Sequence, residues 1–321
     1  MFLFPTKNEQ LWEELWLSAT KSKQIDNSKK PDQNSELGNE KQNGDNGDEP
    51  VKRWDRMAGG FAKRSGSPEA LKRKEKILSM LKEAGALKDG AKVLDIGAGP
   101  GNWTIPMAEL GAVVTALEPS GEMINELKRR IEKSRLDQKK MSSQIDLSNQ
   151  IDIVQKTWQE VNIETAFKDG LFKDKFDLVF ASMTPGISNP ETLLKAMKSA
   201  KSGGFCYLST FSGGGWRNAY KEIWREIFDE DIESHGGDFI YPFNYIYALG
   251  YRPYVEFNIW EHERAESIEE TLETILFFVH GSSDVEPEKK AKLIKYIESK
   301  AEDGIFKYKH QICQGVMLWQ V

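Results

Sequence analysis

Two acidic residues and a glycine-rich run between them have the types and spacing needed to bind a nucleoside. The run VLDIGAGPG places Asp95 just before three alternating glycines, which are Gly97, Gly99 and Gly101. Glycines let the backbone turn sharply and let a ligand approach without a Cβ in the way. Glu118 ends the next apolar run, and a carboxylate there can accept hydrogen bonds from both ribose hydroxyls. The pattern predicts a nucleoside site at the first strand-to-helix turn of an α/β sheet.

The same run departs from the dinucleotide fingerprint G-x-G-x-x-G in two ways. The third glycine comes one residue early, at Gly101, and Asn102 stands where that fingerprint has glycine. Asp95 precedes the turn, and its carboxylate suits a ligand with a cationic group better than a pyrophosphate. Both departures argue against a nicotinamide dehydrogenase.

Alternating strand and helix patterns surround this run and indicate a mostly parallel sheet with right-handed crossovers. An amphipathic helix is expected at residues 68–84, and further helices near 102–110, 121–134 and 190–201. Residues 135–150 read as a polar insert. Strands are expected at residues 91–96, 112–117, 151–154, 176–181 and 204–210.

The C-terminal third has a different pattern. Residues 216–232 predict an extra amphipathic helix, and residues 239–254 are dense in aromatic side chains. Beyond them we expect strands at residues 254–260 and 314–321, with helices at residues 267–279 and 287–301 between. The pattern adds two strands to the five before it.

The N-terminal residues predict a helical arm followed by a linker. Leu11, Trp12, Leu15 and Trp16 fall on one face of a helix over residues 8–19. This arm could pack against the protein's own core or form a lid. Residues 21–50 are polar and too poor in apolar side chains to offset the entropy of ordering, which is typical of a flexible linker. The expected domains are residues 1–20, 21–50 and 51–321, with an insert or lid at about 212–240.

The motifs resemble a known family. VLDIGAGPG and, at residues 116–123, ALEPSGEM are similar to motifs I and II of the class I S-adenosylmethionine (SAM) dependent methyltransferases. The nearest group is type 11, which includes the ubiquinone and menaquinone C-methyltransferases. The resemblance is clear over residues 91–134 and continues loosely through FDLVFASMTPG and KSGGFCYLSTF. It implies a Rossmann-like, mostly parallel seven-stranded sheet with helices on both faces, an N-terminal helical arm and an α-helical insert after the fifth strand.

The resemblance also implies a set of SAM contacts. Asp95 matches the acid that holds the methionine amino group, and Glu118 matches the acid that binds the ribose. The glycines would pass under the ribose and methionine, and Met123 would lie against adenine or else pack in the core. The implied cofactor-binding residues are Asp95, Gly97, Ala98, Gly99, Gly101, Glu118, Pro119, Ser120, Met123, Thr157, Trp158 and Ser182.

The chain departs from the family pattern at two places. After the third strand the family often has an acid beside adenine, whereas this chain has Lys156, Thr157 and Trp158, of which the tryptophan could stack on adenine. After the fourth strand it has SMTPG in place of the Asn- or Asp-Pro-Pro-Tyr of amino-methyltransferases acting on bases or glutamine. The second departure argues against those acceptors. Before the core, Trp54, Arg56 and Phe61 either close over SAM or cap the sheet edge.

The resemblance leaves the acceptor open. Methyl transfer from a sulfonium is an in-line displacement, so no catalytic residue is obligatory and none is assigned. Tyrosines are concentrated between residues 239 and 254, where they could wall an aromatic or lipophilic acceptor or belong to an ordinary packed helix. The candidate acceptor contacts are Trp216, Tyr241, Asn244 and Tyr245. We expect a small-molecule acceptor; a methyltransferase acting on protein or RNA, and a SAM-binding protein without methyl transfer, are alternatives.

Composition narrows the classes of partner. The formal net charge is -6, whereas duplex binding usually needs a basic excess, so nucleic acid is disfavoured. Two cysteines cannot build a disulfide framework, and the four histidines lack zinc-site spacing, so no metal is expected. No stretch is long and apolar enough to span a membrane. The expected location is the cytoplasm, and the oligomeric state is not predicted.

Overall fold

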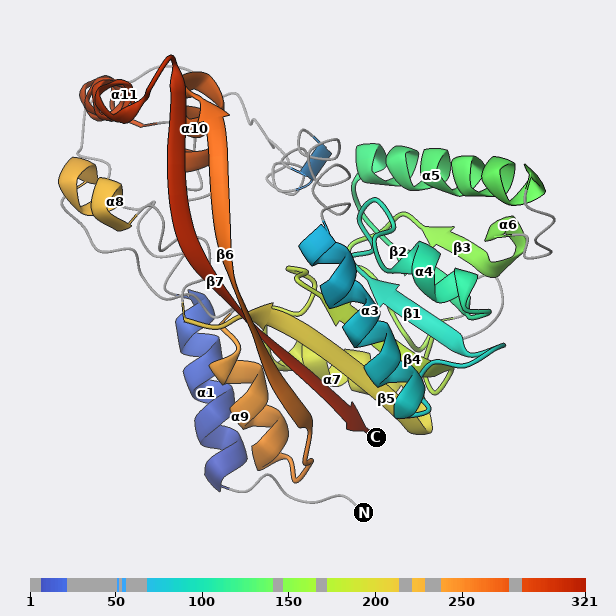
Figure 1. The fold of residues 1–321 in the computed structure, drawn as a ribbon. Helices are drawn as coiled ribbons and strands as arrows, with labels where there is room; N and C mark the ends of the chain where they lie inside the picture. Colours follow the sequence, from blue (N-terminus) through green and yellow to red (C-terminus); the bar gives the residue numbers. More distant parts are fainter. Residues whose placement is uncertain are drawn as a thin grey trace, which may run out of the picture. The chain divides into compact units, whose positions relative to one another are not determined.

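The chain is described by a computed structural model of residues 7–21, 51, 54–55, 68–140, 147–165, 172–213, 221–228, 238–276 and 285–321. Its strands form one seven-stranded sheet in the order β3-β2-β1-β4-β5-β7-β6 (Figure 1). The pairs β1–β2, β1–β4 and β2–β3 are all parallel. The predicted α/β fold with a mainly parallel, seven-stranded, Rossmann-like sheet is confirmed.

Four parallel strands form the half of the sheet that carries the glycine-rich turn. They are β1 (Lys92–Ile96), β2 (Val113–Leu117), β3 (Ile151–Val154) and β4 (Phe176–Ser182). The interior residues of β1, β2 and β4 are buried, as expected of parallel strands covered on both faces. Asp95 of β1 lies opposite Ala116 of β2 and Phe180 of β4, so it belongs to a central strand. The sequence predicted these strands to within one residue at each end.

The first helix of this half precedes β1, and the helices after it lie between consecutive strands, as expected for parallel crossovers. They are α3 (Pro68–Glu83), α4 (Thr104–Glu109), α5 (Gly121–Lys140), α6 (Leu147–Gln150) and α7 (Pro190–Ser199). A capping box begins α7, because the Asn189 side chain accepts from the Thr192 N–H and the Thr192 side chain interacts with the Asn189 backbone. The prediction of a polar insert over residues 135–150 was wrong in part: α5 continues to Lys140, and the short α6 precedes β3.

The rest of the chain forms longer strands than predicted. β5 spans Ala200–Phe211, β6 Tyr254–Ser267 and β7 Ile305–Gln320. Helices α8 (Lys221–Phe228) and α9 (Ile240–Ala248) lie between β5 and β6, which confirms the helical insert. Helices α10 (Ile268–Thr274) and α11 (Pro287–Lys300) lie between β6 and β7. Figure 1 shows β6 and β7 running together along most of their length. Because the two strands pair with each other, polar parts of both form strand although their sequences alone did not predict it.

The chain divides into two compact units. One contains α3 through Leu208 of β5, with Leu249–Tyr254 and Leu318–Val321. The other contains α1 (Lys7–Lys21), Ser209–Ala248 and Val255–Met317. This second unit has its own apolar cluster, made of Ile223, Ile275, Leu276, Leu293, Ile297 and Phe306. The domain boundaries expected from the sequence stay predictions.

The predicted N-terminal helix is present, but its buried face differs from the prediction. Trp16 is 1% exposed and meets the ring of Tyr245 in α9 edge to face, with 6.1 Å between the centroids. Leu11 and Leu15 are exposed, at 50% and 42%. Trp16 therefore packs on α9, and Leu11 and Leu15 lie off the buried face, rather than all four apolar residues sharing it. Within the described residues, no helix is long and apolar enough to cross a membrane.

Candidate functional site

The two predicted acids lie at the carboxyl ends of neighbouring parallel strands. Asp95 is the fourth residue of β1, and Glu118 follows directly after β2. Side chains at the ends of paired parallel strands meet at one edge of the sheet, where ligands of open α/β folds bind. Both carboxylates are buried, with 1% of Asp95 and 5% of Glu118 exposed. The structure thus brings the two acids together beside the glycine-rich turn.

The glycine-rich turn needs glycine for two separate reasons. Gly97, Gly99 and Gly101 all have positive φ, at 73°, 55° and 81°, a conformation that other residues adopt with strain. A Cβ on Gly101 would lie 2.3 Å from the Leu127 side chain of α5, so the helix approaches the turn closely at that point. A Cβ on Gly99 would meet no described atom within 4 Å. The turn is therefore tightly packed behind Gly101 and open at Gly99, where a ligand has room.

Glu118 organises the turn as well as lining it. One carboxylate oxygen accepts the Gly99 N–H at 2.8 Å, and the other accepts the Ser120 N–H at 2.9 Å. Burial raises the pKa of Glu118, and these two hydrogen bonds oppose that rise. Each carboxylate oxygen can accept a second hydrogen bond. Glu118 can therefore hold the turn in place and still accept ribose hydroxyls.

Asp95 is the most strongly perturbed acid at this site. Burial raises its pKa to about 7, the hydrogen bond from Thr104 opposes the rise, and the nearby charge of Glu118 adds to it. The Thr104 hydroxyl donates to Asp95 at 2.6 Å from the first turn of α4. The ionised form of a buried carboxylate with a raised pKa is stabilised by a cation placed beside it. Thr104 was missed by the sequence reasoning; its position at the start of the helix that follows the glycine-rich turn was the available signal.

A second missed residue, Asp55, joins the segment before the core to this site. Its carboxylate accepts the Ser120 hydroxyl at 2.6 Å and the Glu122 N–H at 3.1 Å. Ser120 in turn accepts the Met123 N–H at 3.1 Å, as a helix N-cap does. Neighbouring Trp54 is half-buried, whereas Arg56 and Phe61 lie outside the described residues. No spacing in the sequence linked Asp55 to Ser120, because 65 residues separate them.

The two predicted cofactor contacts after β3, Thr157 and Trp158, both contact other protein groups. Trp158 is 2% exposed, its indole N–H donates to the Thr192 carbonyl at 3.0 Å, and the Lys195 ammonium lies 4.6 Å from its ring centroid. Thr157 donates both its N–H and its hydroxyl to the Glu160 carboxylate, at 2.8 and 2.7 Å. Adenine stacking by Trp158 finds no support in this packing, and its cofactor role stays a prediction.

The loop after β4 lies against the glycine-rich turn. A Cβ on Gly97 would come within 2.1 Å of the Thr184 hydroxyl, so Thr184 occupies the space that any other residue at position 97 would need. Met183 has a φ of 53°, which is strained for a residue with a side chain and is found more often at functional sites. Ser182, the predicted cofactor contact, is half-buried at the end of β4.

The remaining cofactor predictions sit beside the two acids, and the acceptor predictions lie elsewhere in the chain. Ala98 and Met123 are 5% and 3% exposed, and Pro119 is half-buried. In the other compact unit, Tyr245 packs on Trp16, Asn244 donates to the Ile240 carbonyl of its own helix, and Tyr241 is half-buried. Trp216 lies outside the described residues. The acceptor contacts stay predictions.

Comparisons with known proteins agree with this site. A family model described as a methyltransferase domain matches residues 70–236, which is more than half of the chain. The matched region includes the glycine-rich turn, both acids and the loop after β4. No curated protein matches the chain.

Solved structures show limited likeness. A candidate sarcosine dimethylglycine methyltransferase from Galdieria sulphuraria is 15% identical, with a TM-score of 0.44 over 78% of this chain and 86% of that one. Haemonchus contortus phosphoethanolamine N-methyltransferase 2 is 17% identical, with a TM-score of 0.44 over 83% of this chain and 57% of that one. A SAM-dependent methyltransferase from Aquifex aeolicus is 15% identical, with a TM-score of 0.42 over 82% and 98%. These values are too low to carry a functional argument. From the family match over residues 70–236, the chain belongs to the methyltransferase domain family.

Proposed function

We propose that this protein is a SAM-dependent methyltransferase whose acceptor is a small molecule. The observation that carries the proposal is the pair of buried acids, Asp95 and Glu118, on either side of a glycine-rich turn that is open at Gly99. Burial raises the pKa of both carboxyls, so the site favours a ligand that brings positive charge to them. A ligand with an ammonium group, a sulfonium and a ribose diol matches this donor and acceptor set.

In this proposal the chain's residues bind and orient. Asp95 accepts from the methionine ammonium, with Thr104 fixing the carboxylate, and Glu118 accepts from the ribose hydroxyls. The glycine-rich turn lets the cofactor lie against the backbone. SAM, when bound, supplies a methyl group on a sulfonium leaving group. The protein's part is to hold the acceptor in line and to exclude water. We assign no general base.

Three features favour a small-molecule acceptor over a macromolecule. The net charge of -6 works against phosphate backbones. The loop after β4 reads SMTPG and lacks the proline-aromatic clamp of base and glutamine methyltransferases. The tyrosine-rich segment at residues 239–254 offers aromatic side chains for a small acceptor. Methyl transfer to protein or RNA is the alternative that the experiment below separates.

The test begins with calorimetric titration of the purified protein with SAM and, separately, with NAD. We expect SAM to bind and NAD not to bind. Asp95→Ala and Glu118→Ala are each expected to weaken SAM binding by at least about tenfold, since each removes a charged partner. Glu164→Ala is the matched control, because that exposed carboxylate pairs with surface Lys173 and is expected to leave binding unchanged. Binding of NAD in preference to SAM would contradict the proposal.

The acceptor class is tested by turnover. The protein is incubated with SAM and either a small-molecule extract, a protein fraction or RNA, and S-adenosylhomocysteine is measured. Formation only with the small-molecule extract supports the proposal. Formation only with protein or RNA would replace it with the macromolecular alternative.

A further inference from the structure

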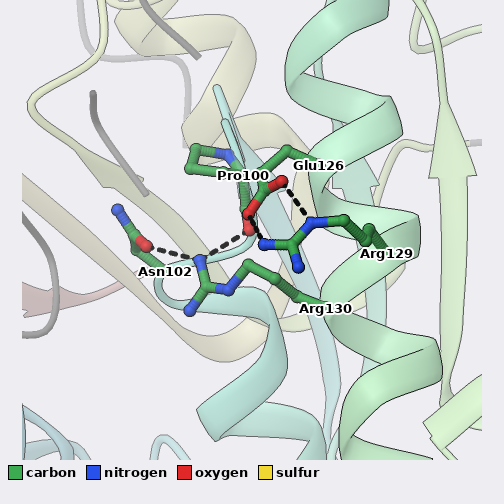
Figure 2. A network of polar contacts seen from close by, with 5 residues as sticks. All are labelled: Pro100, Asn102, Glu126, Arg129 and Arg130. Atoms are coloured by element: carbon green, nitrogen blue, oxygen red, sulfur yellow. Dashed lines mark hydrogen bonds and ion pairs between the residues drawn. The ribbon is translucent and has the colours of Figure 1, made fainter. Parts of the chain in front are cut away.

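One side of the glycine-rich turn is held by an arginine that no family pattern assigned. Arg130 lies in the third turn of α5, and one guanidinium nitrogen donates to the Pro100 carbonyl and to the Asn102 side-chain oxygen, each at 2.7 Å (Figure 2). Pro100 and Asn102 flank Gly101, the glycine of the turn at which a Cβ would meet the Leu127 side chain of α5. A single charged group thus binds the turn on both sides of that glycine.

This contact is part of one face of α5. Met123, Leu127 and Arg130 are spaced to lie on the same side of the helix. Met123 and Leu127 are buried, and Leu127 is the residue that a Cβ on Gly101 would touch. The helix therefore contacts the turn by a close apolar approach and, one turn later, by two charged hydrogen bonds.

The neighbouring arginine offers an internal comparison. Arg129 donates to Glu126 at 2.6 and 2.7 Å, and its side chain is 65% exposed. Figure 2 shows the Arg129 guanidinium turned to Glu126 and that of Arg130 turned to the glycine-rich turn. Burial lowers the pKa of Arg130, and Glu126 partly offsets this. Placing a cation in a partly buried position costs free energy, so its contacts with the turn offset that cost.

We propose that Arg130 is a positioning residue for SAM binding, acting through Pro100 and Asn102 to fix the conformation of the glycine-rich turn. The proposal rests on the proposed function, since the turn is where SAM is expected to lie. It gives Asn102 a role as well. The residue that replaces the third glycine of the dinucleotide fingerprint supplies the acceptor that the arginine binds. With the turn fixed in advance, less ordering is needed when the ligand arrives.

The experiment compares Arg130→Ala with Arg129→Ala in the full chain. Arg130→Ala is expected to raise the SAM dissociation constant, measured by calorimetry, by about 10–100-fold, because two hydrogen bonds to a charged group are lost. It is expected to raise KM for SAM more than it lowers kcat. Arg129→Ala removes the same charge one residue away and should change the SAM dissociation constant and the KM for SAM by less than about twofold. Equal effects of the two substitutions would overturn the proposal.

Two milder variants keep the test informative if Arg130→Ala folds poorly. Arg130→Lys keeps the charge and is expected to recover part of the lost affinity. Asn102→Ala removes one of the two acceptors and should weaken SAM binding less than Arg130→Ala. Combining Asn102→Ala with Arg130→Ala should weaken it no further than Arg130→Ala alone, because both act through one contact. Fully additive losses in the double variant would contradict the proposed route.

A last measurement separates failure of this inference from failure of the proposed function. Hydrogen exchange of residues 97–103 in the ligand-free protein is expected to be faster in Arg130→Ala than in Arg129→Ala. If the wild-type protein binds no SAM, the proposed function fails, and exchange then decides only whether Arg130 fixes the conformation of the turn. Unchanged exchange, or a lower melting temperature with unchanged SAM affinity, would show that Arg130 only stabilises α5.

Discussion

At the residue scale, Asp95 links the site to pH. Its folded-state pKa of about 7 lies above the ordinary value of 3.8, so folding favours its protonated form. The resulting stability is fully present below about pH 4 and is lost as pH rises through about 7. SAM binding has the opposite dependence, since the ammonium needs the ionised carboxylate. The site is therefore expected to bind SAM better as the pH rises through about 7, until the ligand's own amino group loses its proton above about pH 8. The gain in binding falls in the same range in which the free protein loses stability.

Thr104 gives a test of this dependence. The Thr104 hydroxyl donates to Asp95 and lowers its pKa, so Thr104→Val is expected to raise that pKa further. The pH at which SAM affinity falls by half should move upward by about one unit. Calorimetric titration between pH 6 and pH 9 measures the shift. At pH 9 the two proteins should bind alike, and superimposable profiles would count against the role given to Asp95.

At the scale of elements, the packing of α5 against the turn separates two glycines of similar backbone conformation. Both Gly99 and Gly101 have positive φ, but only at Gly101 would a Cβ strike another element, the Leu127 side chain. Backbone strain is common to both positions, and the steric conflict belongs to one.

Gly101→Ala is accordingly expected to cost more stability than Gly99→Ala. Each substitution should cost about 1 kcal/mol from the positive φ, and Gly101→Ala about 1–3 kcal/mol more from overpacking against Leu127. Denaturant unfolding of the two variants measures the difference. Adding Leu127→Ala to Gly101→Ala should remove the clash and leave the cost of the cavity. Equal losses at the two glycines would show that α5 moves aside without cost.

The features that could be predicted from sequence are those whose contacts join residues close together in the chain. β1, β2 and the turn were predictable because Asp95, the glycines and Glu118 lie within one short strand-turn-helix-strand stretch. Asp55 and Arg130 were not predictable, because Asp55 meets Ser120 from 65 residues away and Arg130 meets Pro100 in the turn from 30 residues away, and no local spacing encodes such contacts. The full lengths of β6 and β7 were missed for a related reason. The charged parts that were not predicted, residues 261–267 of β6 and 305–313 of β7, form strand because β6 and β7 pair with each other.

At the scale of the whole molecule, the apolar cluster of the second unit is separate from the acids. Leu293 and Ile297 of α11 are fully buried in it, and both belong to the unit that lacks Asp95 and Glu118. Its contribution to stability should therefore be measurable apart from cofactor binding.

Leu293→Ala tests this separation. The cavity is expected to lower the free energy of unfolding by about 2–5 kcal/mol, while the SAM dissociation constant stays within about twofold. Calorimetric melting and titration of the same sample give both values. A tenfold weaker SAM affinity would mean that the two units are energetically coupled.

The sheet order has a consequence for synthesis on the ribosome. β7 comes after β6 in the chain yet lies between β5 and β6 in the sheet. A nascent chain that has emerged only as far as α11 contains β5 and β6, but β7, which pairs with both of them, has not yet been synthesised. Their unpaired edges could join each other in a non-native hairpin, or join another nascent chain. Translation speed and chaperone supply over residues 254–320 are therefore expected to govern the yield of folded protein more than the same factors acting over the glycine-rich turn.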